Sequence, residues 1–303
     1  MKRRDFIKNS AAAGVMASVG SFGLLSFTEP PRQKKITILH TNDVHSHIDP
    51  FASDHGSYPG QGGVARRYEL ISKIRRENPN TLLLDAGDMF QGTPYFNFYG
   101  GELEFKLMSK MGYDAATIGN HEFDNGIEGL AAQLHNAHFR ILSANYDFSN
   151  TLLDGLTEPY RVYELDGIRI GVFGLGIELE GLVGKKQYKE TRYLDPVEIS
   201  TDMTTILRDQ EQCDLVICLS HLGYDYQGDK ISDVKLARAT RDIDLIIGGH
   251  THTFLPEPVV VSNKDGKDVL INQVGWAGVR LGRIDFYFDQ EDQVKGNGLS
   301  IKV

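Results

Sequence analysis

Short apolar runs recur along this chain from residue 35 onward, and they constrain its fold more than any other feature of the sequence. Most are rich in leucine or β-branched residues and are bounded by Gly, Asn or Asp. Runs of this kind predict buried strands. The expected strands are 36–39, 81–84, 115–118, 140–143, 168–173, 215–219, 245–247, 269–272 and 283–288.

Between several of these runs lie segments with helical patterning, at 63–77, 102–111, 127–138 and 196–212. Strands that alternate with helices predict an α/β architecture in which helices cover the sheet faces. The runs 160–164 and 169–173 are joined around Asp166-Gly167, and Asp-Gly is a strong signal for a two-residue hairpin turn. We therefore expect mixed rather than purely parallel sheets.

Polar side chains follow five of the expected strands directly. Ligands of open α/β sheets gather at the carboxyl ends of strands. Imidazole, carboxylate and amide groups together suit Zn, Mn, Fe or Mg-like ions. One such motif alone could be two surface histidines on a turn, but five in succession indicate a metal site. The segments that follow the strands are 40–45, 85–88, 119–124, 220–221 and 248–252.

These segments resemble the ordered signature of the calcineurin-like metallophosphoesterases. The matching motifs are Asp43-x-His45, Gly87-Asp88, Gly119-Asn120-His121-Glu122-Phe123-Asp124, Ser220-His221 and Gly248-Gly249-His250-x-His252. Their flanks are similar to the 5′-nucleotidase and UDP-sugar hydrolase branch, over about residues 35–290. The resemblance implies an α/β (α+β) fold, a four-layer αββα sandwich of two mixed sheets, with a dinuclear metal site at the strand ends.

The resemblance also implies a ligand set for two divalent metal ions. Asp43, His45 and His252 would hold the first ion, and Asn120, His221 and His250 the second. Asp88 would bridge the two. The implied reaction is hydrolysis of phosphate monoesters or anhydrides of nucleotides, by in-line attack of a metal-bound water or hydroxide.

Two further residues take catalytic roles by the same resemblance. His121 would stabilise the phosphoryl charge or help the leaving oxygen depart. Asp124 would orient His121, although Asp124 is also a candidate N-cap for the helix near Ile127, and both roles can hold. Glu122 is expected only to accept hydrogen bonds behind the site.

Other notable side chains have plainer interpretations. We expect Trp276 to pack in the core or at the rim rather than to stack on a base. Cys213 and Cys218 flank a strand and are too far apart along it for a disulfide, so both should be buried thiols. Structural or surface roles are expected for His40, His47, His55, His135 and His138.

The first residues are similar to a bacterial twin-arginine export signal. Arg3-Arg4-Asp5-Phe6-Ile7-Lys8 is followed by an apolar stretch at about 11–27. A membrane anchor is the alternative, but the stretch is short and weakly apolar for a spanning helix, so no stable membrane insertion is expected after signal removal. We expect a signal at 1–28, a short tether at 29–35, the catalytic domain at 36–303 and a periplasmic or otherwise exported protein. A net charge of −9 argues against nucleic acid as a partner.

The resemblance covers only the catalytic domain of the two-domain members of the branch, and we expect their C-terminal nucleotide-binding domain to be absent. Three interpretations stay open: a catalytic domain with loose specificity, a subunit that works with a separately encoded nucleotidase domain, or a relative acting on another ester. The last includes 2′,3′-cyclic nucleotide phosphodiesterases and thiosulfate-ester hydrolases. A metal-binding protein without catalysis is the alternative from a different class.

Overall fold

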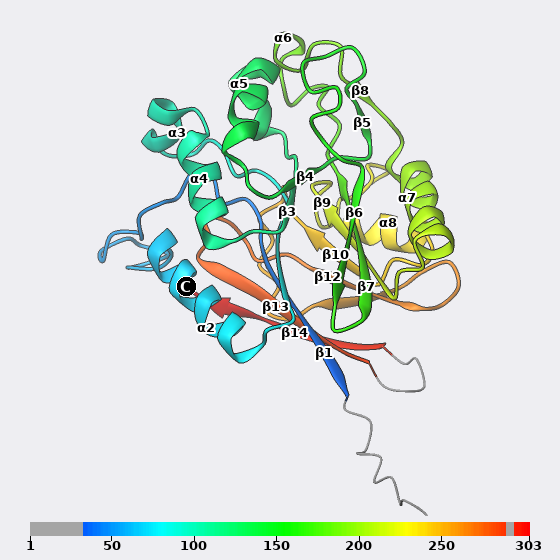
Figure 1. Ribbon diagram of the computed structural model, residues 1–303. Helices are drawn as coiled ribbons and strands as arrows, with labels where there is room; N and C mark the ends of the chain where they lie inside the picture. The colour runs from blue at the N-terminus through cyan, green and yellow to red at the C-terminus, as the bar shows by residue number, and fades with distance from the viewer. Residues whose placement is uncertain (1–32, 289–293) are drawn as a thin grey trace, which may run out of the picture. The chain divides into compact units, whose positions relative to one another are not determined.

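Two six-stranded mixed sheets form the centre of the protein (Figure 1). The computed structural model describes residues 33–288 and 294–303. The first sheet has the order β14-β13-β1-β2-β3-β4. Strands β1 to β4 run parallel, and β13 and β14 join them antiparallel at one edge. The strands are β1 (Lys34–Thr41), β2 (Thr81–Asp85), β3 (Ala115–Thr117), β4 (Arg140–Leu142), β13 (Arg280–Phe288) and β14 (Val294–Lys302).

The second sheet has the order β11-β12-β10-β9-β7-β6. Its four central strands run parallel, and β11 and β6 are antiparallel edges. The strands are β6 (Tyr160–Leu165), β7 (Ile168–Leu175), β9 (Leu215–Ser220), β10 (Leu245–Gly248), β11 (Val259–Ser262) and β12 (Asp268–Asn272). A small two-stranded sheet pairs β5 (Tyr146–Asp147) with β8 (Arg192–Tyr193).

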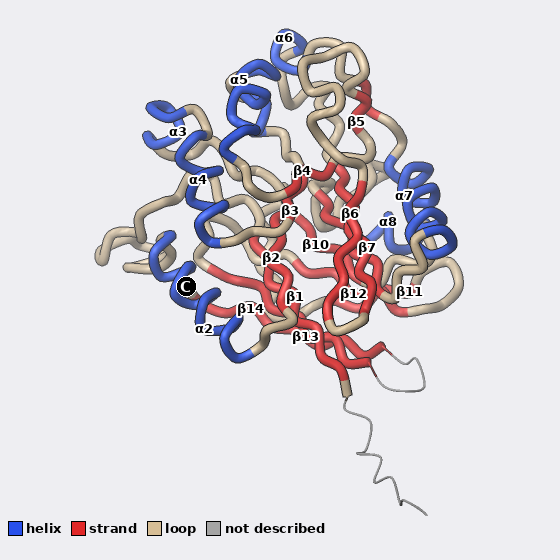
Figure 2. The backbone as a smooth tube through the Cα atoms, viewed as in Figure 1, coloured by secondary structure: helices blue, strands red, loops and turns tan. Residues whose placement is uncertain are grey.

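Helices lie on both sides of the paired sheets (Figure 2). Those on the side of the first sheet are α2 (Val64–Glu77), α3 (Pro94–Tyr99), α4 (Glu102–Met111) and α5 (Gly126–Gln133). Those on the side of the second sheet are α7 (Pro196–Thr205) and α8 (Asp233–Ala239), while α6 (Lys185–Tyr188) lies near α5. Three short turns complete the set: the 3-10 helices η1 (His121–Phe123) and η2 (Leu134–Asn136), and the π-helical η3 (Ile206–Gln210).

Three apolar cores separate the layers. Alternate residues of β1 and β7 point between the sheets, so that Ile38 and Val172 belong to the same buried cluster. The intervening Leu39 packs instead beneath the helices of the first side. Phe173 packs beneath α7 and α8 on the other side. Because side chains alternate between the two faces of a strand, one strand contributes residues to two cores. The predicted four-layer αββα sandwich is confirmed.

The nine predicted strands are all present, and the predicted hairpin is confirmed. Strand β6 pairs antiparallel with β7, and the turn residues Asp166 and Gly167 have φ angles of 54° and 73°. Two successive positive φ angles define a type I′ turn, whose twist matches that of the flanking strands. Aspartate and glycine tolerate this conformation better than most residues, which is why the dipeptide predicted it.

The structure differs from the prediction at several elements, since strands β5, β8, β11 and β14 and helices α3, α6 and α8 were not predicted. The helix expected over 127–138 ends as a 3-10 turn, whose Asn136 carbonyl accepts a hydrogen bond from Ser109 on α4. The helix expected over 196–212 widens into the π-helical η3. Strand β14 was not predicted because its sequence has glycines in place of an apolar run. A Cβ at Gly296 would lie 2.5 Å from the Leu270 side chain, so close packing explains that glycine.

Two predictions about the rest of the chain have different outcomes. Cys213 and Cys218 are both buried free thiols, as predicted. The predicted export signal lies outside the described residues. Within 33–288 and 294–303, no helix combines the length and apolar character needed to cross a bilayer.

Candidate metal centre

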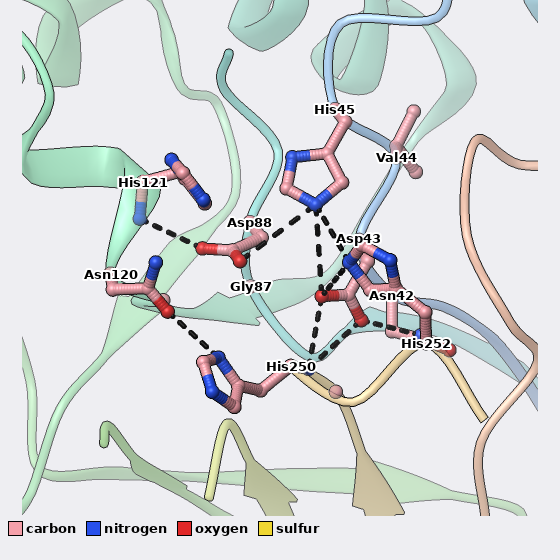
Figure 3. Close-up of polar contacts among 12 residues, drawn as sticks. Asn42, Asp43, Val44, His45, Gly87, Asp88, Asn120, His121, His250 and His252 are labelled. Carbon is pink, nitrogen blue, oxygen red and sulfur yellow. Dashed lines mark hydrogen bonds and ion pairs between the residues drawn. The ribbon is translucent and has the colours of Figure 1, made fainter. Parts of the chain in front are cut away.

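All seven predicted metal ligands and both predicted catalytic residues lie in segments that follow the carboxyl ends of parallel strands. Figure 3 shows Asp43, His45, Asp88, Asn120, His121, His250 and His252 among them. The segments after β1, β2 and β3 come from the first sheet, and those after β9 and β10 from the second. The site therefore lies at one end of the sandwich, where the two sheets meet.

Several of these residues have strained backbones. The residues Asp43, His45, Asp88, His250 and His252 have φ angles of 48°, 49°, 55°, 70° and 52°. Residues other than glycine seldom adopt this left-handed conformation, which costs of the order of 1–3 kcal/mol each. Such strain clusters at functional sites, where the fold holds side chains in positions that regular structure would not provide.

The first group of side chains contains Asp43, His45 and His252, with one potential ligand atom from each within 4.8 Å of the others. The Nε2 atoms of His45 and His252 are 3.0 Å apart. Asp43 Oδ1 lies 3.3 Å from His252 Nε2 and 3.9 Å from His45 Nε2. Three potential ligand atoms thus converge on one point.

The second group contains Asp88, His221 and His250, again within 4.8 Å of one another. Asp88 Oδ2 is 3.0 Å from His221 Nε2 and 3.9 Å from His45 Nε2, so it lies between the two groups. Asn120 reaches the same group, with its Oδ1 2.9 Å from His250 Nδ1. The structure thus brings the seven predicted ligand side chains together at one place.

The hydrogen bonds of His221 test whether a metal ion fits this site. Its Nδ1 lies 2.6 Å from the Ala86 carbonyl oxygen, so Nδ1 carries the proton that it donates. Nε2 faces the Asp88 carboxylate at 3.0 Å without the direction of an N–H hydrogen bond, and the ring carries a positive charge near pH 7 because Asp88 raises its pKa. The buried Asp88 carboxylate thus needs a positive charge at this position, and a divalent cation would supply it in place of the His221 proton. The donor set fits a divalent metal ion.

The pKa values reflect the same arrangement. Burial lowers the pKa of His221, but the Asp88 carboxylate outweighs burial and raises it to about 10. Burial favours a higher pKa for Asp88, yet His221 holds it well below its usual range. Burial, reinforced by His221, lowers the pKa of His250 to about 4. Hence Asp88 is anionic and His250 is neutral near pH 7, the states in which both can bind a metal.

His121 and Asp124 form a pair at the edge of the site. His121 Nδ1 lies 2.8 Å from Asp124 Oδ2, and this hydrogen bond raises the pKa of His121 to about 9. Helix α5 has Asn125 rather than Asp124 at its N-cap position. The alternative N-cap role of Asp124 is therefore wrong, and its side chain is directed to His121.

A cavity of about 370 Å³ opens beside the first group. It is lined by His45, Gln91, Gly92, His121, His252 and Trp276. About a third of the His121 side chain is exposed, whereas that of His221 is fully buried. Substrate can therefore reach His121 and the first group from this cavity.

Glu122 contributes more to this site than the sequence indicated. Its fully buried carboxylate accepts hydrogen bonds from four backbone N–H groups. These belong to Asp88, Met89, Phe90 and Gly119, at 2.9, 2.8, 3.1 and 2.7 Å. It thus joins the segment after β2 to the segment after β3. No sequence signal for this role exists beyond the position of Glu122 beside His121.

One glycine of the site, Gly119, is required because its backbone lies very close to the Asp88 side chain. A Cβ at Gly119 would lie 2.2 Å from Asp88 Oδ1. That carboxylate oxygen also accepts a hydrogen bond from the His121 backbone N–H at 2.9 Å. Any larger residue at 119 would displace the carboxylate that lies between the two groups.

The five histidines expected to have plain roles are absent from both ligand groups in the described part of the chain. His40 is buried in the core, where Asn272 Nδ2 lies 3.0 Å from its Nε2, and burial lowers its pKa to about 3. The His47 ring packs edge-on to Trp276 rather than toward the ligands, with centroids 5.1 Å apart.

A pair of Asp/His groups with a carboxylate between them, at the end of an αββα sandwich, defines a candidate dinuclear metal centre of the type that metal-dependent hydrolases use. The calcineurin-like phosphoesterase family matches residues 36–254, and the chain belongs to this family. Members of the family bind two divalent metal ions.

Three relatives illustrate the similarity. The chain is 35% identical over 285 residues to a snake venom 5′-nucleotidase of Gloydius brevicauda, a match that covers 86% of this chain and 46% of the relative. It is 32% identical to the trifunctional nucleotide phosphoesterase protein YfkN of Bacillus subtilis, covering 91% of this chain and 20% of that protein. The solved 5′-nucleotidase precursor of Thermus thermophilus is 35% identical with a TM-score of 0.79, covering 89% of this chain and 55% of that one. The chain thus spans about half the length of the two 5′-nucleotidases and a fifth of the length of YfkN.

Proposed function

We propose that this chain is the catalytic domain of a dinuclear-metal hydrolase that cleaves phosphate monoesters or anhydrides of nucleotides. The observation that carries the proposal is the position of Asp88 between two Asp/His groups, next to a cavity lined by His121. The nucleotide phosphoesterases among its relatives support the substrate class.

The side chains of the two groups would hold the metal ions. Asp43, His45 and His252 would bind one, and Asn120, His221 and His250 the other, with Asp88 shared. Bound divalent ions would neutralise the phosphoryl oxygens and make water acidic enough to attack at neutral pH. The hydrogen bonds of His45 Nδ1 to the Phe90 carbonyl and of His221 Nδ1 to the Ala86 carbonyl would leave Nε2 of each ring as the atom that binds a metal ion.

His121 would act on the leaving group. Asp124 accepts the hydrogen bond from Nδ1, so the other ring nitrogen of the imidazolium is free to donate. As the bond from phosphorus to the ester oxygen breaks, this nitrogen would donate its proton to the departing oxygen, while water supplies the new oxygen on phosphorus. Asp124 stabilises the charged ring before this transfer.

The partner and the location of the protein are proposals too. A separately encoded C-terminal nucleotidase domain would add substrate contacts that the longer relatives carry within one chain. The twin arginines Arg3-Arg4 and the apolar stretch after them support export to the periplasm, with the signal at 1–28, the tether at 29–35 and the catalytic domain at 36–303. Comparing the secreted fraction of wild type with that of an Arg3→Lys, Arg4→Lys variant tests export.

Phosphate release by the signal-less protein tests the activity. The substrates are AMP, a UDP-sugar, a 2′,3′-cyclic nucleotide and bis-p-nitrophenyl phosphate, each with Mn, Zn, Mg or a chelator. We expect metal-dependent hydrolysis of AMP or the UDP-sugar that the chelator abolishes. If protein with two bound metals per chain hydrolyses none of them, the chain is a metal-binding protein and the proposal is wrong.

A further inference from the structure

A cluster of aromatic side chains lies beside the cavity, and we call it the aromatic shelf (His47, Phe51, Tyr58, Phe254, Trp276). Trp276 is at its centre, with ring centroids 5.1 Å from His47, 6.0 Å from Phe51 and 6.3 Å from Tyr58. Tyr58 in turn lies 6.0 Å from Phe254, which is 40% exposed. The shelf thus continues from the cavity toward the surface.

The shelf begins directly at the candidate metal centre. The Trp276 ring stacks on the ring of His252, with an interplanar angle of 7° and centroids 5.8 Å apart. Trp276 is only partly buried, and it lines the same cavity as His121 and His45. An aromatic surface and the predicted leaving-group residue therefore belong to one cavity.

The backbone around Trp276 is held rigidly to the metal centre. Asn42 Nδ2 donates to the Gly275 carbonyl at 2.6 Å, and the Ala277 N–H donates to the Asp43 carbonyl at 2.8 Å. These bonds lie on both sides of Trp276 and connect it to the segment that carries Asp43. The ring is therefore positioned before any ligand arrives, which reduces the entropic cost of binding.

We propose that the aromatic shelf is a subsite for a planar aromatic ring carried by the leaving group, such as the base of a nucleoside, with Trp276 as its principal contact. The subsite rests on the proposed function, because it needs a phosphate ester held at the metal centre. His252 and Trp276 stack on each other and line one cavity with His121, so a group attached to a phosphate held by His252 would lie within reach of the shelf. Aromatic side chains stack on every nucleobase and tolerate changes of base, so this domain would contribute to nucleotide selectivity by itself.

A purely structural role of Trp276 makes different predictions. If Trp276 only packs against His252, its loss disturbs the metal centre equally for every phosphate ester. A stacking subsite adds a loss that depends on whether the substrate has an aromatic ring. It also predicts that an aromatic ring binds near Trp276 without any turnover.

Fluorescence tests the ring contact directly, since Trp276 is the only tryptophan of the chain. We expect adenosine, titrated into the Mn-loaded protein with excitation at the red edge of the indole band, to quench the emission saturably, whereas ribose does not. The Trp276→Phe variant gives the background. Absence of saturable quenching by adenosine at millimolar concentrations would overturn the subsite, and this outcome does not depend on hydrolysis.

Kinetics test its effect on substrate choice. The quantity is the ratio of kcat/KM for AMP to kcat/KM for ribose 5-phosphate. Trp276→Ala should lower kcat/KM for both esters, because its loss disturbs His252. It should also lower the ratio of the two kcat/KM values by about tenfold, and Trp276→Phe should restore most of this ratio. Tyr68→Ala, at an exposed aromatic residue of α2 outside the shelf, controls for general effects. An unchanged ratio in Trp276→Ala would contradict the subsite, whereas no hydrolysis of either ester by wild type would contradict the proposed function instead.

Discussion

The two sides of the candidate centre differ in how deeply the fold encloses them. The side chains of His221 and Asp88 are 0% and 2% exposed, whereas those of His121 and His252 are 32% and 39% exposed. The enclosed side is surrounded by strand ends of both sheets, and the open side lines the cavity. The fold thus holds the shared carboxylate rigidly and leaves the groups that would meet substrate accessible.

Asp88→Ala should have the largest effect, because Asp88 would be shared by both metal ions in the proposed centre. We expect both metal ions and all hydrolysis to be lost, as measured by elemental analysis and phosphate release. Asp114→Ala is the matched control, since Asp114 precedes β3 at the end of the sheet away from the site. Retention of two metals by Asp88→Ala would show that this carboxylate is not shared.

His121→Ala should have the second-largest effect, and it distinguishes a loss of catalysis from a loss of metal binding. Turnover should fall by ~10² to 10⁴ fold, the usual contribution of acid–base catalysis, with two metals still bound. Asp124→Asn should show a smaller loss in the same direction, because it weakens only the orienting hydrogen bond. If His121→Ala lost its metals as Asp88→Ala does, the assignment of roles would be wrong.

Replacement of one histidine on the open side and one on the enclosed side tests whether the two sides of the centre differ. His252→Gln should lose activity that excess Mn restores, because mass action offsets a weakened open site. His221→Gln should not recover, since the buried Asp88 carboxylate loses the partner it faces. Metal titrations that restored both variants equally would remove the distinction between the enclosed and open sides.

Glu122→Gln should have the smallest effect of the four and tests how the enclosed side is held. The amide would place an NH₂ group against two of the four backbone N–H groups from which Glu122 now accepts hydrogen bonds. We expect metal affinity to fall by ~10 to 100 fold, as for other residues that orient ligands. Asp114→Asn, which weakens a carboxylate contact to the Leu83 N–H, is the control. Equal metal affinity in wild type and Glu122→Gln would contradict the positioning role.

Much of the fold was predictable because its strands are buried on both faces. A strand such as Leu215–Ser220 reads as a continuous apolar run, and the polar residues that follow it stand out. The edge strand β14 could not be recognised in this way, because Gly296 packs closely against Leu270 of the other sheet and Phe286 of the paired strand β13. Local pattern carries no information about such contacts.

The candidate site, like the fold, has features that the sequence predicted and features that depend on contacts between distant residues. The residue types and their positions after strands indicated a metal site, and the family resemblance supplied the ligand set. Glu122 was expected to accept hydrogen bonds behind the site, but its four backbone partners were not predictable, since the sequence does not show which N–H groups will face it. The stacking of Trp276 on His252 was not predictable either, because it depends on the relative placement of two loops.

The sequence by itself determined the chemistry of the site: which carboxylates, imidazoles and amides follow which strands. Tertiary structure decided their pairing, which brings the His250 N–H within 2.9 Å of Asp43 Oδ1 across 207 residues of chain. The physical reason is that strand patterns are local, with a period of two residues, whereas the packing of one sheet on the other is not. Only that packing places Asp88 between two groups drawn from both sheets.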